Sequence, residues 1–281
     1  MRMFGFRAGR GGLAAAAAVA LAAIMPAVAS AAPTTTVSVD GSRLTVVGDA
    51  SANNASVYGD QSQACPGGPP CYAIISADDV VAADVPCVVT ETGDPFWIAL
   101  CPSVGIAGIT VIGREGDDDL KTGALAPLGL AVPALLEGGG GEDYLRGSQG
   151  EDVVRGGEDD DYLSGGSAED LLVGGAGDDN LGGGSEADVL RGGGGEDYLY
   201  GRLGDDLLQG ERASDHISGN AGRDRLIGGL GVDYLTGGLG ADRLFGSRGA
   251  DFLNGSKGRD RCDGGKQPDR AQSCERLLRI P

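Results

Sequence analysis

The chain has 281 residues, of which 41 are acidic and 22 basic, so its net charge is −19 and its isoelectric point is near 4.3. This excess of negative charge argues against nucleic acids and anionic membrane surfaces as partners, because both attract positively charged proteins. Aromatic residues make up only 5 % of the chain, whereas glycine occurs 53 times. We therefore do not expect one conventional globular core over the whole length.

Residues 1–31 are typical of a secretory signal peptide. Three arginines among the first ten residues precede an alanine-rich apolar segment from Leu13 to Ile24, and the small-residue sites Ala27-Val28-Ala29 and Ala29-Ser30-Ala31 follow it. The apolar segment is too short to span a membrane comfortably. We therefore expect a secreted, extracellular protein with no membrane span once the signal is removed.

Residues 32–112 are predicted to form a small β-rich head. The segments Thr34–Val39 and Arg43–Val47 flank an Asp40-Gly41 turn, which is a hairpin pattern. Further strands are expected at Tyr72–Ile75, Pro86–Thr90, Phe96–Leu100 and Ile109–Ile112.

Six cysteines are expected to form disulfides, because an even number in a secreted protein is typical of disulfide bonding. Cys65, Cys71, Cys87 and Cys101 lie in the head, where three pairings are open. Cys65–Cys71 would close a Pro/Gly-rich loop and Cys87–Cys101 would join neighbouring strands, and we favour this pairing. A third bond, Cys262–Cys274, would hold the last part of the chain closed.

The segment from Gly138 to Gln272 is a nine-residue repeat without insertion or deletion. It divides into 15 consecutive units, each with glycine at the first position and aspartate at the sixth. The eighth position is Leu, Ile or Val in all units except the last two, which have Cys262 and Ala271. A fixed period of this kind indicates a repeat architecture.

Each position of the unit has a physical role. Glycines at the first, second and fourth positions permit positive φ, so the chain can turn tightly. The last three residues alternate as in a short strand, with the eighth facing the core. Two units make one coil, and stacked coils would line up aspartates that repel one another. A divalent cation that prefers oxygen ligands, such as Ca²⁺, would resolve this repulsion.

The pattern resembles the calcium-binding nonapeptide repeat of the RTX, or hemolysin-type, family, GGxGxDxUx. The resemblance implies an all-β fold, a right-handed parallel β-roll of about eight coils. It also implies several Ca²⁺ ions as cofactors, held by aspartate carboxylates and main-chain carbonyls. The metal ligands it suggests are Asp118, Asp143, Asp152, Asp161, Asp170, Asp179, Asp188, Asp197, Asp206, Asp215, Asp224, Asp233, Asp242, Asp251 and Asp260, with Asp269 as an additional candidate.

The roll is expected over residues 113–272, because Gly113 to Lys121 forms a detached first unit. Residues 122–137 are predicted to be an apolar insertion, a loop or short helix that covers the open end of the roll. Residues 273–281 are predicted to cap the other end. Units without glycine at the second or fourth position, such as those with Ser148 and Asp159, are expected to have strained turns or to bind calcium more weakly.

Four tyrosines at the seventh position, Tyr144, Tyr162, Tyr198 and Tyr234, are predicted to share one outer face of the roll. One interpretation is a ligand face for a glycan or cell-surface partner, as in an extracellular adhesin or carbohydrate-binding module. The other is cross-strand packing that stabilises the sheet. The residues alone favour the second.

Enzymatic activity is not expected. The sequence contains neither the HExxH zinc motif nor the GxSxG nucleophile motif that enzymes with similar rolls carry. Acids in the head, among them Asp78, Asp79 and Glu91, leave a carboxylate-pair glycosidase as the alternative. The sequence therefore predicts a secreted calcium-binding repeat protein that folds on binding Ca²⁺.

Overall fold

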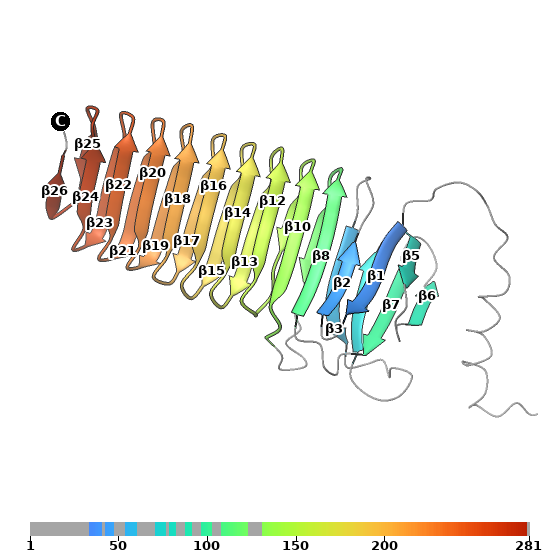
Figure 1. Ribbon diagram of the computed structural model, residues 1–281. Helices are drawn as coiled ribbons and strands as arrows, with labels where there is room; N and C mark the ends of the chain where they lie inside the picture. Colours follow the sequence, from blue (N-terminus) through green and yellow to red (C-terminus); the bar gives the residue numbers. More distant parts are fainter. Residues whose placement is uncertain are drawn as a thin grey trace, which may run out of the picture. The chain divides into compact units, whose positions relative to one another are not determined.

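The computed structural model describes residues 108–122 and 131–279, together with the seven strand backbones between residues 34 and 102. The predicted signal peptide and the side chains of the four head cysteines lie outside the described residues. The regular elements of the described part are all strands, in two sheets of 13 (Figure 1). No described helix has the length and apolar character needed to cross a membrane.

The first sheet, called sheet A, contains the even-numbered strands of the repeat array. In spatial order its strands are β26 (Arg276–Leu278), β24 (Arg261–Gly265), β22 (Arg243–Arg248), β20 (Arg225–Leu230), β18 (Leu207–Arg212), β16 (Val189–Gly194), β14 (Leu171–Ala176), β12 (Val153–Glu158), β10 (Ala134–Gly140), β8 (Gly108–Glu115), β2 (Arg43–Val47), β1 (Thr34–Asp40) and β5 (Asp79–Ala82).

The second sheet, called sheet B, contains the odd-numbered strands of the array. In spatial order its strands are β25 (Arg270–Gln272), β23 (Phe252–Gly258), β21 (Tyr234–Gly240), β19 (His216–Gly222), β17 (Tyr198–Leu203), β15 (Asn180–Ser185), β13 (Tyr162–Ser167), β11 (Tyr144–Arg146), β9 (Asp119–Thr122), β3 (Asn54–Asp60), β4 (Cys71–Ser76), β7 (Trp97–Pro102) and β6 (Val88–Glu91).

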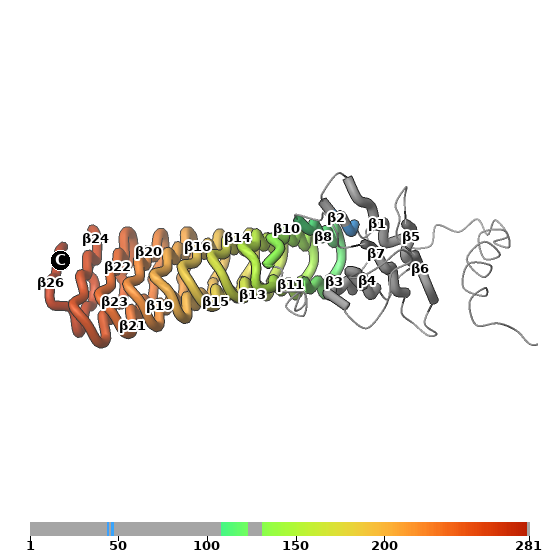
Figure 2. The backbone as a smooth tube through the Cα atoms, turned by 90° about the horizontal axis from the view of Figure 1, so that it is seen from below, coloured from blue at the N-terminus to red at the C-terminus, as the bar shows by residue number. Residues whose placement is uncertain are grey.

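The array is a parallel β-solenoid of about eight turns, as the period predicts. Each strand pairs in parallel with the strand two units later, so that Leu172 lies beside Leu190 in sheet A and Leu163 beside Leu181 in sheet B. Figure 2 shows the two sheets as two rows, one on each side of the coil. The two views together give a right-handed winding, the hand that crossovers between parallel strands adopt.

The core consists of the residues at the eighth position of each unit. From Leu136 to Leu253 these side chains are at most 2 % exposed. Burying one such side chain contributes about 1.5–3 kcal/mol. A single row from each sheet therefore forms a narrow core, which explains how a chain with so few aromatic residues forms an extended structure.

The head continues both sheets. The predicted hairpin is present as β1 and β2, which pair antiparallel with Asp40 opposite Arg43. Strand β2 then pairs in parallel with β8, and β3 pairs in parallel with β9. Strands β3 and β5 were not predicted from the sequence, because β3 contains asparagine and glycine and β5 is very short.

The prediction of a capping insertion over residues 122–137 is wrong for its last residues. Residues 134–137 belong to β10, which pairs with β8 on one side and β12 on the other. Leu136 is fully buried in the core row although its unit has Ala134 where the others have aspartate. The row of buried aliphatic residues in sheet A therefore continues from Leu136 to Val111 of β8 and Val46 of β2, beyond the aspartate-bearing units of that sheet. The roll is not open at this end, since β8 and β9 pair with strands of the head.

The C-terminal end is closed by the predicted Cys262–Cys274 disulfide, whose Cα atoms are 6.0 Å apart. Cys262 occupies the core row, and β26 adds a last strand to sheet A beside β24. The disulfide that the structure describes is thus in the tail, and the pairings predicted for the head lie outside the described side chains.

Candidate metal centre

The sixth-position aspartates form two stacks, one at each turn of the coil. Their side chains are almost completely buried, with exposed fractions between 0 % and 3 % from Asp118 to Asp260. The stack that precedes the strands of sheet B contains Asp118, Asp143, Asp161, Asp179, Asp197, Asp215, Asp233, Asp251 and Asp269. The stack that precedes the strands of sheet A contains Asp152, Asp170, Asp188, Asp206, Asp224, Asp242 and Asp260.

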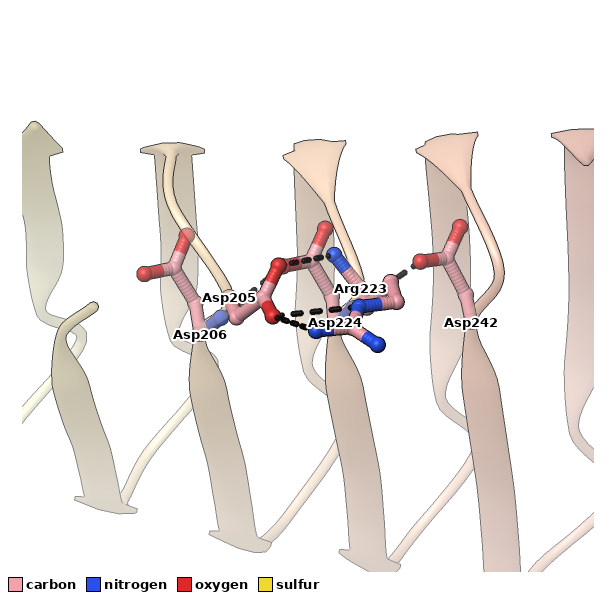
Figure 3. Close-up of polar contacts among 5 residues, drawn as sticks. All are labelled: Asp205, Asp206, Arg223, Asp224 and Asp242. Atoms are coloured by element: carbon pink, nitrogen blue, oxygen red, sulfur yellow. Dashed lines mark hydrogen bonds and ion pairs between the residues drawn. The ribbon is translucent and has the colours of Figure 1, made fainter. Parts of the chain in front are cut away.

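One oxygen of each carboxylate is held by a hydrogen bond from the neighbouring coil. The main-chain N–H of Asp197 donates to Oδ1 of Asp215 at 3.0 Å, and the same bond recurs along both stacks between aspartates two units apart. Figure 3 shows it from Asp206 to Asp224 and from Asp224 to Asp242, each at 2.9 Å. At the start of the stacks, Asp118 donates to Asp143 across the insertion, and Ala134 is the donor to Asp152. These bonds fix the rotamers of the stacked aspartates.

The second carboxylate oxygen, Oδ2, points toward the first-position glycine of its own unit. A Cβ atom on Gly192 would lie closer than 3.0 Å to Oδ2 of Asp197, and Gly183 has the same relation to Asp188. On Gly174 a Cβ atom would also meet the carbonyl oxygen of Gly192 in the following coil. Glycine is therefore required at the first position because carboxylate and carbonyl oxygens occupy the space of a side chain.

Oδ2 is buried and has no hydrogen-bond donor in the described part of the chain. This holds for every sixth-position aspartate from Asp143 to Asp260 except Asp152, and also for Asp269. An unpaired buried carboxylate oxygen costs several kcal/mol unless a counter-charge approaches it. The stacks therefore present rows of buried anionic oxygens that fit an oxygen-preferring cation.

Burial raises the pKa of these carboxyl groups well above the ordinary 3.8. The pKa rises to about 8 at Asp161, Asp170 and Asp215 and to about 7 at Asp197, chiefly because desolvation disfavours the anion. The hydrogen bond from the preceding aspartate N–H lowers the pKa and only partly offsets this effect, while neighbouring carboxylates raise it further. Without a counter-ion, the stacks are therefore electrostatically unfavourable when fully ionised.

The turns keep their conformation where glycine is replaced. Nine non-glycine residues at the second or fourth positions have φ between 70° and 82°, a region that costs other residues about 1–2 kcal/mol. They are Asp159, Ala168, Glu186, Arg202, Glu211, Ala213, Asn220, Ser247 and Ser256. The close stacking of successive turns imposes this geometry, because carbonyl oxygens such as that of Gly175 project onto the same position of the next coil.

Ser148 is different, and it changes the environment of Asp152. Its φ is not positive, and its N–H and hydroxyl both donate to Oδ2 of Asp152, at 2.6 and 3.3 Å. Oδ1 of Asp152 accepts from the N–H of Ala134 at 2.7 Å. Both oxygens of this carboxylate are thus paired, and its pKa is raised only to about 6.

The structure brings the predicted aspartates together, but mainly in single file. In the described residues no three His, Cys, Asp or Glu side chains converge as a metal cluster would require. An ion between the turns would therefore depend on main-chain carbonyls in addition to the carboxylates, which is a common ligand set for Ca²⁺. In the sequence, the glycine positions of the turns are the only indication of such carbonyl ligands.

Two features that continue the pattern of the stacks were not anticipated. Glu275 accepts the N–H of Asp260 through Oε2, so it takes the place of the next aspartate in the tail. A second, solvent-exposed ladder runs along the fifth positions, where the N–H of Arg223 donates to Oδ1 of Asp205 and its guanidinium to Oδ2 (Figure 3). In the sequence, this ladder is indicated only by the spacing of two units between the fifth-position residues that it joins.

The tyrosines lie on the outer face of sheet B, as predicted, and stack on one another. The ring of Tyr144 lies 4.8 Å from that of Tyr162, and Tyr198, His216, Tyr234 and Phe252 form a continuous ladder with the same spacing. The rings are parallel to within 4°. Most ring faces are therefore covered by a neighbouring ring, which agrees with the packing interpretation.

Comparison with protein families gives a match over the repeat array. The model described as RTX calcium-binding nonapeptide repeat (4 copies) matches residues 137–172, 173–208, 200–235, 209–244 and 236–271. No curated protein shows significant similarity to the chain. Repeats of this family bind Ca²⁺, and the stacked buried aspartates are consistent with several ions.

Proposed function

Because residues 137–271 of this chain are RTX-type calcium-binding repeats, we propose that the protein is a secreted calcium-binding repeat protein whose roll folds on binding Ca²⁺. The observation that carries the proposal is the row of buried Oδ2 atoms without a donor, from Asp161 to Asp260. A cation supplies the positive charge that these atoms lack, and its binding free energy becomes folding free energy.

The proposed ligands are the sixth-position aspartates together with carbonyl oxygens of the glycine-rich turns. Calcium neutralises the carboxylates and removes their mutual repulsion when it is bound. We exclude Asp152 from this set, because Ser148 and Ala134 already donate to both of its oxygens. Asp118 and Asp269 belong to the ends of their stack and are proposed as end sites.

The proposed coupling follows from the small core of each coil. A coil buries only two aliphatic side chains and, in addition, two carboxylates whose desolvation opposes folding. A bound cation removes that opposition, so the coil folds when the ion is present.

Secretion is proposed because residues 1–31 resemble a signal peptide. It agrees with the calcium concentration that the sites of the roll are expected to require. Extracellular modules bind Ca²⁺ at about 10⁻⁴–10⁻³ M. The array would then remain unfolded where calcium is scarce and fold after export. We propose no catalytic role, since the feature that the repeats provide is ion binding.

The test is a calcium titration of the mature chain, starting from chelator and followed by far-UV circular dichroism. We expect a cooperative gain of β signal at submillimolar to millimolar Ca²⁺, which Mg²⁺ at the same concentration does not produce. Magnesium fails because it requires a small octahedral site and retains its water. A roll that is fully folded in chelator would show that the Leu rows suffice, and would remove calcium-coupled folding from the proposal.

A further inference from the structure

The outer face of sheet B contains two grooves that meet at Arg202. One, of about 710 Å³, crosses β17, β19 and β21 and is lined by Tyr200, Leu203, Ser218, Asn220, Thr236 and Leu239. The other, of about 450 Å³, crosses β9, β11 and β13 and is lined by Lys121, Arg146, Ser148, Ser164 and Ser167. Arg202 lines both grooves, so the two form one path across the strands.

The charge of this path is opposite to that of the protein. The chain has a net charge of −19, yet neither groove is lined by an aspartate or glutamate. Three cationic side chains line the path: Lys121, Arg146 and Arg202. Lys121 is paired with Asp119, whereas Arg146 and Arg202 make no ion pair within the described residues. The path is therefore a local cationic surface on an acidic protein.

The guanidinium of Arg202 lies over the middle of the path. It covers Gly182, where a Cβ atom would lie 3.0 Å from Nη2, and Gly182 is buried as a result. Gly182 belongs to β15, whose outward positions are Asn180, Gly182 and Gly184. Strand β15 thus carries almost no outward side chain, while its neighbours carry tyrosine, serine and arginine.

The same strand interrupts the aromatic ladder. Tyr162 on β13 and Tyr198 on β17 both lie beside Asn180, and the stacked pairs on either side of it do not continue across it. The two tyrosines are separated by two strand spacings, whereas stacked rings in the ladder are one spacing, 4.8 Å, apart. The ladder is therefore broken at one ring position, which the shorter side chain of Asn180 takes. The side-chain amide of Asn180 has no hydrogen-bond partner among the described residues and lies at the base of this gap.

We propose that this path, together with the break in the aromatic ladder beside it, binds a segment of an acidic polysaccharide, with one uronic acid ring over Asn180 between Tyr162 and Tyr198 and its carboxylate on Arg202. A guanidinium binds a carboxylate through two parallel hydrogen bonds, and the tyrosine faces cover the apolar faces of the sugar ring. The Asn180 amide donates to or accepts from a ring hydroxyl. This site is separate from the calcium stacks and requires only that the roll is folded.

The lining on both sides of Arg202 favours a polymer of sugars over a peptide or a nucleic acid. Hydroxyl and amide side chains line both arms, and these groups match a polyhydroxylated chain. With cations only at intervals, the path does not provide the dense phosphate contacts that nucleic acids need. A ligand reaching from β9 to β21 would cross six strand spacings of the sheet, which is long enough for several sugar units.

The experiment uses the calcium-loaded full-length mature chain and isothermal titration calorimetry. The probes are oligosaccharides of hyaluronan, polygalacturonate and polyglucuronate, each beside its carboxyl-reduced, neutral counterpart. Calcium is kept in excess, so that binding of calcium by the sugars does not unload the roll. We expect at least one acidic probe to bind, and its neutral counterpart to bind at least tenfold more weakly.

Two substitutions locate the site. Asn180→Tyr fills the gap and completes the ladder, so it is expected to preserve or raise thermal stability while reducing affinity at least tenfold. Arg202→Gln is expected to lose about tenfold for the acidic probe and little for the neutral one. The control is Arg225→Gln on the outer face of sheet A, which should leave affinity unchanged.

Two results would overturn the proposal: no binding by any acidic probe, or affinity that Asn180→Tyr leaves unchanged. Binding of DNA or of an acidic peptide with an equal dependence on Asn180 would also replace the sugar by that ligand. Circular dichroism of each variant in calcium separates these outcomes from failure to fold, and hence from failure of the calcium proposal.

Discussion

The main-chain N–H of Asp197 donates a hydrogen bond of 3.0 Å to Oδ1 of Asp215, and Oδ2 of both carboxylates is left buried without a donor among the described residues. The same residue thus uses one oxygen to join two coils and presents the other to the space between turns. Because the first oxygen fixes the rotamer, the second cannot turn to water. These two roles explain why an aspartate lies in the interior of each stack, although neighbouring carboxylates repel one another.

Replacing Asp197 by Asn separates these two roles. The amide oxygen can still accept the N–H of Asp179, but the negative charge is lost. In chelator we expect equal or higher stability, because a buried charge has been removed. In calcium we expect the midpoint of the folding titration to rise about tenfold, which corresponds to ~1.4 kcal/mol.

The matched control is Asp152→Asn, because Ser148 and Ala134 pair both oxygens of Asp152. It should lower the stability of the calcium-loaded roll by about 1–3 kcal/mol through a lost acceptor. The number of Ca²⁺ ions bound at saturation, counted by calorimetry, should be unchanged in Asp152→Asn and reduced in Asp197→Asn. If Asp152→Asn also loses a bound ion, our exclusion of Asp152 from the ligand set is wrong.

Gly192→Ala tests the close approach of the carboxylate. The new methyl group would overlap Oδ2 of Asp197, so the aspartate must move and its bond to the neighbouring coil is disturbed. We expect a loss of at least about 2 kcal/mol and weaker calcium binding. Gly194→Ala is the control two residues away, since no atom lies within 4 Å of its Cβ position. It should be neutral or slightly stabilising, and thermal unfolding in calcium compares the two.

The calcium-free roll should be more stable at pH 5 than at pH 8.5. Burial raises the pKa of Asp161, Asp170 and Asp215 from 3.8 to about 8, so the folded state binds protons more tightly than the unfolded state. The stabilising protonation is complete below about pH 4 and is lost as the pH rises through about 8. The folded fraction in chelator, followed by far-UV circular dichroism across this window, measures the trend and should rise as the pH falls.

In saturating calcium this dependence should disappear between pH 5 and 8.5, because the carboxylates are then ionised both in the unfolded chain and in the calcium-bound roll. Thermal unfolding of the calcium-loaded protein over this range measures it. A calcium-saturated roll that loses stability toward pH 8.5 as the calcium-free roll does would indicate that the carboxylates do not bind the ion.

Removal of the tail disulfide should loosen one end of the array and leave the rest unchanged. Cys274→Ser breaks the bond to Cys262, which closes a short loop and contributes about 2–3 kcal/mol. Since each coil contacts only its neighbours, the loss should be local. Hydrogen exchange is expected to increase in β24–β26 but not in β14–β18. Uniform exchange along the array would show that the coils unfold as a single unit.

The repeat period determined most of the fold before any tertiary contact was considered. Glycine, aspartate and an aliphatic residue in constant phase require turns and strands of equal length, and only a stacked coil buries the aliphatic row. The same reasoning predicted the tail disulfide, because Cys262 stands where the core residue belongs. It failed at residues 134–137, because Leu136 continues the core row in a unit that has no aspartate.

The tertiary structure alone decided which oxygens and ring faces are available. Nothing in the nine-residue unit distinguishes Asp152 from Asp197, since the difference lies in the donors that Ser148 and Ala134 place against Asp152. Likewise, four tyrosines in one column predict an aromatic face, but stacking at 4.8 Å covers that face except beside Asn180. A one-dimensional pattern assigns a side chain to a face, whereas its hydrogen bonds and free surface depend on neighbours in the adjacent coils.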